Sequence, residues 1–231
     1  MDSLDVSPNT RVLALLGVSD PDPAVGYGWF IADSCLFNRL LAGLGKQQTW
    51  LMPLNLDSVV EGYGRGLHGN PFRPRRVVYD STMPLFAIVT VYESDLRAAY
   101  LESLRATCRA AARDNDLIHL ISIGHGPNEI FGFCIGDSLG DGSSVILLPK
   151  DVHDILRNEL DGSPVAIILS SCFSGGWLTS DQSVLAAVKE GGESDSYQRS
   201  ALTVDQGPRP TWVTIPPPRR HRLRTESVAE G

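Results

Sequence analysis

The sequence predicts an α/β fold in which a mostly parallel sheet of four to six strands lies between helices. Short apolar runs such as Arg11–Gly17 and Val165–Leu169 have the composition of strands that are buried on both faces. Amphipathic stretches separate these runs, as crossover helices separate parallel strands. The chain has 231 residues, of which 42% are hydrophobic and 20% charged, and this is enough to bury a substantial core.

The first half of the chain contains three clear elements and one long irregular stretch. Arg11–Gly17 (RVLALLG) predicts a buried strand, Trp29–Leu44 a helix that ends near Gly43 and Gly45, and Gln48–Met52 a short second strand. The residues from Pro53 to Pro84 carry several glycines and prolines and a basic run. They favour a long solvated loop.

The second half continues the alternation of strands and helices. The apolar spacing and the start signals predict the strand Phe86–Val91, the helix Glu93–Asp114, the strand Leu117–Gly124, a hairpin strand at Ile130–Ile135, the helix Asp151–Leu160 and the strand Val165–Leu169.

The C-terminal part gives weaker signals. Asp181–Lys189 predicts one more helix, and Ala201–Val204 is the remaining strand candidate. Residues 207–231 hold five prolines and five arginines, a composition that favours disorder. We therefore expect one α/β domain over residues 8–205, followed by a disordered tail over residues 206–231.

Composition argues against several classes of protein. The net charge of −7 and the pI of about 5.2 make nucleic acid an unexpected partner, because phosphate binding needs a basic face. No signal peptide or membrane-spanning segment is recognisable, so no membrane partner is expected. Four cysteines in a chain of this length favour a reducing location, cytoplasmic or nuclear. Neither a cofactor nor a metal is expected, since His119 and His125 have no paired cysteines beside them.

Two predicted strands run directly into residues that are capable of covalent chemistry. Leu117–Gly124 is followed by His125 and Gly126, and Val165–Leu169 leads to Cys172 and two glycines. Ligands of open parallel sheets bind beyond the carboxyl ends of the strands. If the two strands are neighbours, His125 and Cys172 face one cleft.

These residue types suit nucleophilic catalysis. An imidazole can take the proton of a thiol, and the thiolate is a strong nucleophile. The backbone N–H groups of Gly126 and Cys172 are candidates for an oxyanion hole. Taken singly, a cysteine after an apolar strand is more often a small core residue, and a loop histidine is more often structural. Their matching positions favour the catalytic interpretation.

The order of these segments resembles a known family. A hydrophobic block ending in His125-Gly126 precedes a second block ending in Cys172, and the two residues are 172 − 125 = 47 positions apart. With GHG, FGFCIGD and IILSSCFSGGW, residues 11–180 resemble caspase-like cysteine peptidases, which include caspases, metacaspases and legumains. The resemblance is strongest to fungal caspase-like proteins, in which HG and CxSGGW segments recur.

The resemblance implies a three-layer caspase-like fold and a cysteine endopeptidase that cleaves polypeptides through an acyl-enzyme intermediate. It implies Cys172 as the nucleophile, His125 as the acid and base, and the Gly126 and Cys172 amides as the oxyanion hole. The position two before the cysteine usually helps to line the specificity pocket, as Asp in metacaspases and Glu in legumains. Here that position is Ser170.

Other residues must then supply any charge in this specificity pocket. Asp20 and Asp22, in the loop after the first strand, are candidates for substrate binding, although turns rich in Asp and Pro are common without a function.

The sequence departs from the family pattern a second time, after Cys172, and this departure leaves a second function open. The family continues after the cysteine with further strands, whereas this chain continues with polar residues and the Pro/Arg-rich tail. The alternative is an inactive caspase-like homologue that acts as a binding or regulatory module, or a truncated product. An exposed sheet edge on that side would then favour a homodimer.

Overall fold

Six parallel strands form the central sheet and position the candidate residues. The computed structural model describes residues 6–22, 27–70, 73–127, 130–136, 145–160, 162–177, 183–186 and 200–202. The described helices are α1 (Gly28–Leu40), α2 (Leu56–Tyr63), α3 (Glu93–Asp114), α4 (Pro149–Glu159) and the 3-10 turn η1 (Ser174–Trp177). The described strands are β1 (Thr10–Leu16), β2 (Gln47–Met52), β3 (Gly66–His68), β4 (Arg76–Tyr79), β5 (Ile88–Thr90), β6 (Leu117–Ile123), β7 (Phe133–Ile135), β8 (Val145–Leu147), β9 (Val165–Ser170), β10 (Ser183–Ala186) and β11 (Ser200–Leu202).

The main sheet has the strand order β10-β9-β6-β1-β2-β5, and each neighbouring pair is parallel. Two small antiparallel sheets accompany it, β11-β3-β4 and β7-β8. The predicted α/β class and the parallel sheet of four to six strands are therefore confirmed.

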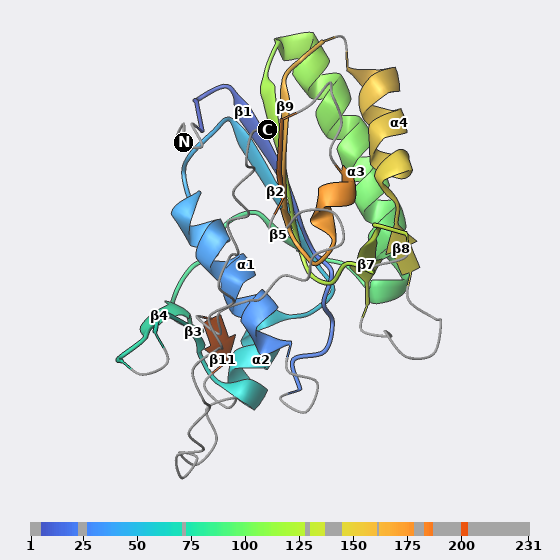
Figure 1. The fold of residues 1–231 in the computed structure, drawn as a ribbon. Helices are drawn as coiled ribbons and strands as arrows, with labels where there is room; N and C mark the ends of the chain where they lie inside the picture. The colour runs from blue at the N-terminus through green and yellow to red at the C-terminus, as the bar shows by residue number, and fades with distance from the viewer. Residues whose placement is uncertain are drawn as a thin grey trace, which may run out of the picture.

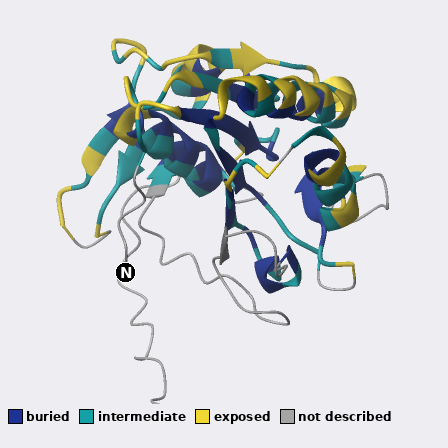
Figure 2. Cartoon of the chain, turned by 90° about the horizontal axis from the view of Figure 1, so that it is seen from above, coloured by how far each residue is buried: buried dark blue, intermediate teal, exposed yellow. Residues whose placement is uncertain are grey.

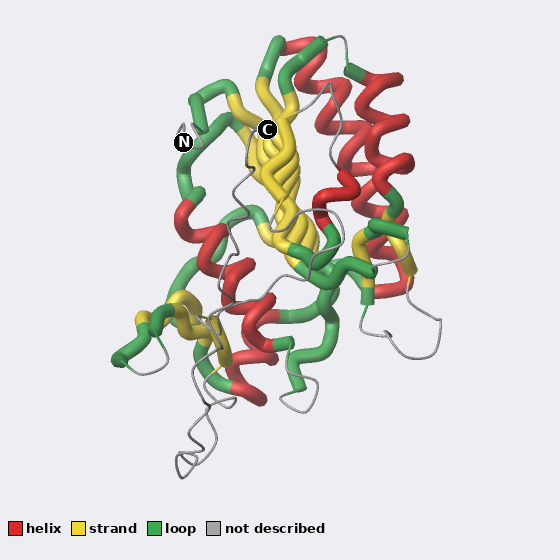
Figure 3. Tube along the Cα trace, in the orientation of Figure 1, coloured by secondary structure: helices red, strands yellow, loops and turns green. Residues whose placement is uncertain are grey.

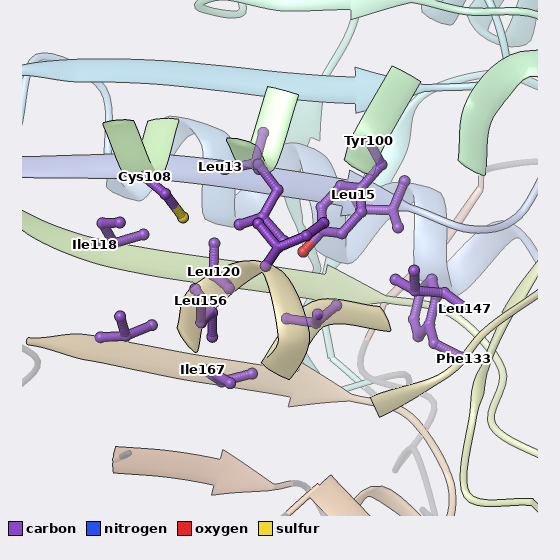
Figure 4. Close-up of a cluster of buried hydrophobic side chains, with 14 of the residues drawn as sticks. Leu13, Leu15, Tyr100, Cys108, Ile118, Leu120, Phe133, Leu147, Leu156 and Ile167 are labelled. Carbon is purple, nitrogen blue, oxygen red and sulfur yellow. The ribbon is translucent and has the colours of Figure 1, made fainter. Parts of the chain in front are cut away.

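Helices cover both faces of the sheet, as Figures 1 and 3 show. On one face, α3 and α4 pack against Leu13, Leu120 and Ile167 in one hydrophobic cluster, part of which is drawn in Figure 4. On the other face, α1 and α2 pack against Val12 and Ile121. Figure 2 shows the strands buried between helices whose outer sides are exposed. Successive residues of a strand point to opposite faces of the sheet. Helices cover both faces of β1, and its residues are accordingly apolar at nearly every position.

Two basic and two acidic side chains form a cluster of ion pairs at the amino-terminal edge of the sheet. Arg11, at the start of β1, donates from Nε to Asp116 over 2.7 Å and from its terminal nitrogen to Asp114 over 2.6 Å. Lys46 bonds to both carboxylates over 2.9 Å. Arg11 and Asp116 are buried, so the partners compensate each other's charge where water cannot.

The region from Pro53 to Pro84 is not the long loop that its composition favoured. It forms α2, β3 and β4. The side chain of Asn55 accepts hydrogen bonds from the backbone N–H groups of Asp57 and Ser58 and so caps α2. The β3-β4 hairpin pairs with β11, a segment more than 130 positions away in the sequence, and this long-range pairing has no local signal.

Two helix predictions need correction. The helix predicted at Asp181–Lys189 is wrong, because Ser183–Ala186 forms β10, which pairs in parallel with β9. The open edge of β9 supplies the hydrogen bonds that override local helix propensity there. The helix predicted to extend to Leu44 ends at Leu40, and the side chains of Leu40 and Leu44 are exposed.

The remaining expectations concern cysteines, membranes and the tail. Within the described residues, Cys35, Cys108, Cys134 and Cys172 form no disulfide. Among the helices in the described ranges, none is both long and apolar enough to cross a bilayer. The predicted tail over residues 206–231 lies outside the described residues.

Candidate active site

His125 and Cys172 follow two strands that are direct neighbours. In the β6-β9 pair, Ile123 lies opposite Ser170, and the ladder continues with a bond from the Gly124 N–H to the Ser170 carbonyl over 3.2 Å. Because the strands are parallel, the segments that follow β6 and β9 leave the sheet at the same edge. The structure thus brings the segments of His125 and Cys172 together, as expected from the sequence.

This edge includes the point where the strand order reverses. The chain places β2 and β5 on one side of β1, and β6, β9 and β10 on the other. The crevice of an open parallel sheet lies at such a point, beyond the carboxyl ends of the strands. In this sheet that point lies between the loop after β1, which carries Asp20 and Asp22, and the loop after β6, which carries His125.

Gly126 packs against the main chain of Cys172. A β-carbon at position 126 would lie 2.1 Å from the Cys172 carbonyl oxygen and 3.4 Å from Oγ of Ser171. No side chain fits in that space, so glycine is required for the two loops to meet. This contact brings the backbones of the two predicted oxyanion-hole residues together.

The β7 strand crosses the carboxyl ends of β1 and β6. The Cys134 N–H donates to the His125 carbonyl over 2.9 Å, and the Gly136 N–H donates to the Gly17 carbonyl over 2.7 Å. The Phe133 ring lies over Gly124, where a β-carbon would come within 2.9 Å of it. These contacts fix the backbone on which His125 is carried.

Two aromatic rings surround the His125 imidazole. The Tyr27 ring centroid lies 4.4 Å from it at 65°, and the Phe30 centroid lies 4.6 Å from it at 73°, both in edge-to-face geometry. Nε2 of His125 is buried and has no hydrogen-bond partner within the described ranges. Burial lowers the pKa of His125 to about 4, so the ring is neutral at pH 7.

Cys172 differs from the other three cysteines in its exposure. Cys35, Cys108 and Cys134 are buried, whereas Cys172 is partly exposed. Burial raises the pKa of Cys35 and of Cys108 to about 12. Burial, and then the charge of Cys172, raise the pKa of Cys134 to about 11. Cys172 is thus the accessible thiol of the four.

The backbone turns sharply just after Cys172. Phe173 has a φ of +52°, in the left-handed region that side chains other than glycine rarely adopt. The 3-10 turn η1 follows at once and buries Trp177 in the cluster beneath α3 and α4. Non-glycine residues in this conformation cost about 1 kcal/mol or more and often occur at functional turns.

The three predicted substrate-binding residues lie at the same edge in different settings. Ser170 ends β9 and is partly buried. It falls on the same side of the sheet as Ile168, the side that α1 covers. Asp20 accepts a hydrogen bond from the Asp22 N–H over 2.8 Å, as in a local turn. A role of these residues in substrate binding stays a prediction.

Sequence reasoning missed the residues that surround the imidazole. The sequence pattern singles out neither Tyr27 nor Phe30 nor Cys134 as a neighbour of His125. No local signal marks them, because they reach His125 only when the start of α1 and the β7 strand fold over the carboxyl edge of the sheet. His68 also gains a neighbour that spacing did not reveal, since its Nδ1 lies 3.8 Å from the Asp33 carboxylate.

A cavity of about 480 Å³ lies elsewhere, beyond β2 and β5. Asn55, Tyr79, Met83 and Ile88 are among its lining residues, and none of the described lining residues belongs to the loops of His125 or Cys172. Among the described lining residues, the Tyr79 hydroxyl donates to the Asp57 carboxylate over 2.7 Å, but no cysteine or histidine lines the cavity. The meeting of the two loops, rather than this cavity, therefore marks the candidate active site.

A scan of the chain against models of protein families finds no match, and a search of curated proteins finds no significant match either.

Proposed function

We propose that this chain is a caspase-like cysteine endopeptidase in which Cys172 is the nucleophile and His125 the acid and base. The observation that supports the proposal most strongly is the parallel pairing of β6 and β9, with Gly126 seated against the Cys172 carbonyl. The accessibility of the Cys172 thiol and the neutral imidazole of His125 also support it. The resemblance of the GHG and CFSGGW segments suggests polypeptides as the substrate class.

The proposed reaction proceeds in two balanced steps. His125 takes the proton of the Cys172 thiol, the sulfur attacks the peptide carbonyl carbon, and the carbonyl electron pair moves to the oxygen. The N–H groups of Gly126 and Cys172 would stabilise that oxyanion by about 3 kcal/mol. The amine then leaves with the proton from His125, and water hydrolyses the thioester to release the acid and restore the thiol.

The free thiols suggest where the enzyme works. A catalytic thiol and three further cysteines, none of them in a disulfide within the described residues, are compatible with the reducing interior of a cell, and we propose a cytoplasmic or nuclear location.

Hydrolysis of a mixture of internally quenched peptides tests the proposal. We expect Cys172→Ala to abolish cleavage and His125→Ala to reduce it by about 10²- to 10⁴-fold. Cys108→Ala is the matched control, because Cys108 is a buried residue of α3, in the cluster on the other face of the sheet from α1. A peptidyl acyloxymethyl ketone should add to Cys172 and to no other cysteine. Cleavage that persists in Cys172→Ala would refute the proposal.

An inactive binding or regulatory module is the second candidate. The observation that favours it is that the described residues add a single strand, β10, to the sheet beyond β9. In that case the wild-type chain would cleave no peptide, and the ketone would label Cys172 no faster in the wild type than in His125→Ala. A homodimer through the β10 edge belongs to this candidate, and sedimentation over a range of concentrations tests it.

A further inference from the structure

The aromatic residues beside His125 hold the ring in a fixed position. The buried Phe30 ring stacks on Trp29 with centroids 3.4 Å apart and an angle of 28° between the rings. Tyr27 lies 6.4 Å from Phe30, also in edge-to-face geometry. The imidazole thus contacts two rings that are themselves held by neighbours, and both rings come from the start of α1.

The two nitrogens of the imidazole are in unequal surroundings. Nε2 is buried and has no hydrogen-bond partner in the described residues, whereas Nδ1 is not among the buried atoms that lack a partner. The face of an aromatic ring carries negative charge, so it accepts an N–H and repels a lone pair. Nε2 is the buried nitrogen of an imidazole whose described ring neighbours are Tyr27 and Phe30, and a proton on Nε2 is favoured where it meets the face of either ring.

We propose that Tyr27 and Phe30 are positioning residues that keep His125 neutral, with its proton on Nε2, so that Nδ1 is the base for the Cys172 thiol. This inference rests on the proposed function and specifies how its base is prepared. The thiol proton moves to Nδ1, the ring becomes a cation between two apolar neighbours, and the same proton then leaves with the departing amine. The apolar surroundings favour that return of the proton.

The charges around the ring are compatible with this assignment. Burial is the one resolved cause of the lowered pKa of His125. The titratable side chains on the neighbouring described segments are Tyr27, Asp33, Cys35 and Arg39 at the start of α1 and along it, Asp20 and Asp22 after β1, Cys134 on β7, and Cys172 after β9. No charged group is therefore needed to explain why the ring stays neutral.

Nitrogen NMR of protein labelled with ¹⁵N-histidine tests the inference directly. The His125 signals are assigned by comparison with His125→Gln, since the chain has five histidines. In the wild type at pH 7 we expect one tautomer, with Nε2 protonated and Nδ1 bare, and a titration midpoint near pH 4. A proton on Nδ1, or an ordinary midpoint near 6.5, overturns the inference even if no variant folds.

Four variants separate positioning by the rings from general burial. Phe30→Leu and Tyr27→Leu keep an apolar side chain and remove the ring, so each should raise the midpoint and admit the second tautomer. Tyr27→Phe keeps the ring and should leave both unchanged. Phe37→Leu is the matched control, because Phe37 packs in the same cluster from the same helix about 10 Å further along it. Equal effects of Phe30→Leu and Phe37→Leu would overturn the inference.

The outcomes of this experiment and of the peptide assay can be told apart. If His125 shows the expected tautomer but Cys172→Ala keeps full cleavage, the proposed function fails and the assignment of the ring stands. If cleavage depends on Cys172 and His125 but Phe30→Leu changes neither tautomer nor midpoint, the positioning role alone fails. In the supporting case, Phe30→Leu also moves the acid limb of kcat/KM to higher pH by the shift seen in the NMR titration.

Discussion

Gly126 lies directly against the carbonyl oxygen of Cys172, so that a single added carbon at position 126 would come within 2.1 Å of that oxygen. The contact joins a loop that leaves β6 to a loop that leaves β9, across 46 residues of sequence. It makes the geometry of the candidate site depend on the absence of a side chain.

Substitution of Gly126 tests this dependence. Gly126→Ala must push the Cys172 loop away, and we expect kcat/KM for peptide cleavage to fall by about 100-fold or more. Overpacking should also lower the free energy of unfolding by about 1–3 kcal/mol. The control is Gly62→Ala in α2, where an added β-carbon meets no atom within 4 Å. That change should stabilise the protein slightly, by up to about 1 kcal/mol. Equal activity in both variants would contradict the requirement for glycine at the contact between position 126 and the Cys172 carbonyl.

The four cysteines should react at very different rates with iodoacetamide. Cys172 is partly exposed, whereas Cys35, Cys108 and Cys134 are buried with a raised pKa. In the native protein at pH 7.5 we expect Cys172 to be modified first, and in urea we expect all four rates to converge. Peptide mass spectrometry gives the rate at each site. Fast native modification of Cys108 would show that the core beneath α3 is not closed as described.

The pH dependence of activity follows from the neutral His125. The general base must be unprotonated, and burial lowers the pKa of His125 to about 4. Activity is therefore present above that value and is lost as pH falls through about 4, not through 6.5. Initial rates of peptide cleavage from pH 3.5 to 8 give the profile. An acid limb near 6.5 in protein that circular dichroism shows to be folded would mean that the ring is not buried when it works.

The same pKa predicts how folding stability depends on pH. The unfolded chain binds a proton at His125 near pH 6.5 and the folded chain near pH 4, so this contribution is complete above 6.5 and is lost as pH falls. Between pH 7.5 and 5 the loss is at most about 2 kcal/mol. Urea unfolding of wild type and His125→Gln at both values measures it. The variant should lose less stability than wild type over this range.

The cluster of ion pairs around Arg11 and Asp116, at the amino-terminal edge of the sheet, should affect folding stability without affecting the candidate active site at the carboxyl edge. Burial raises the pKa of Asp116, but hydrogen bonds from Lys46 and Arg11 outweigh this effect and lower it. Asp116→Ala leaves Arg11 buried with one partner fewer, so its urea midpoint should fall further than that of Lys46→Met, in which the exposed amine is replaced. Alkylation of Cys172 in the folded variants should stay at the wild-type rate. A change in the alkylation rate would show that the two edges of the sheet are energetically coupled.

The local sequence pattern was sufficient to predict a helix or strand where the residues of that segment alone carry the signal. The helix Glu93–Asp114 has the predicted bounds, because its buried leucines, Tyr100 and Cys108 recur at helical spacing over 22 residues. The strands β1, β6 and β9 are apolar on both faces, which also predicts that helices cover both faces. Where partners are distant, as for the β3-β4 hairpin with β11 or β10 beside β9, local propensity predicted a loop or a helix instead.

The sequence by itself determined the class of fold, the main strands, and the two chemically capable residues that follow β6 and β9. Their chemistry is a property of residue type, and their place at strand ends follows from local hydrophobic pattern. Only the tertiary structure decided that β6 and β9 are neighbours and that Gly126 meets Cys172. It also decided that Tyr27 and Phe30 surround His125. Strand order and the packing of loops depend on contacts between segments far apart in the chain, and the free energy of those contacts is not encoded in any one segment.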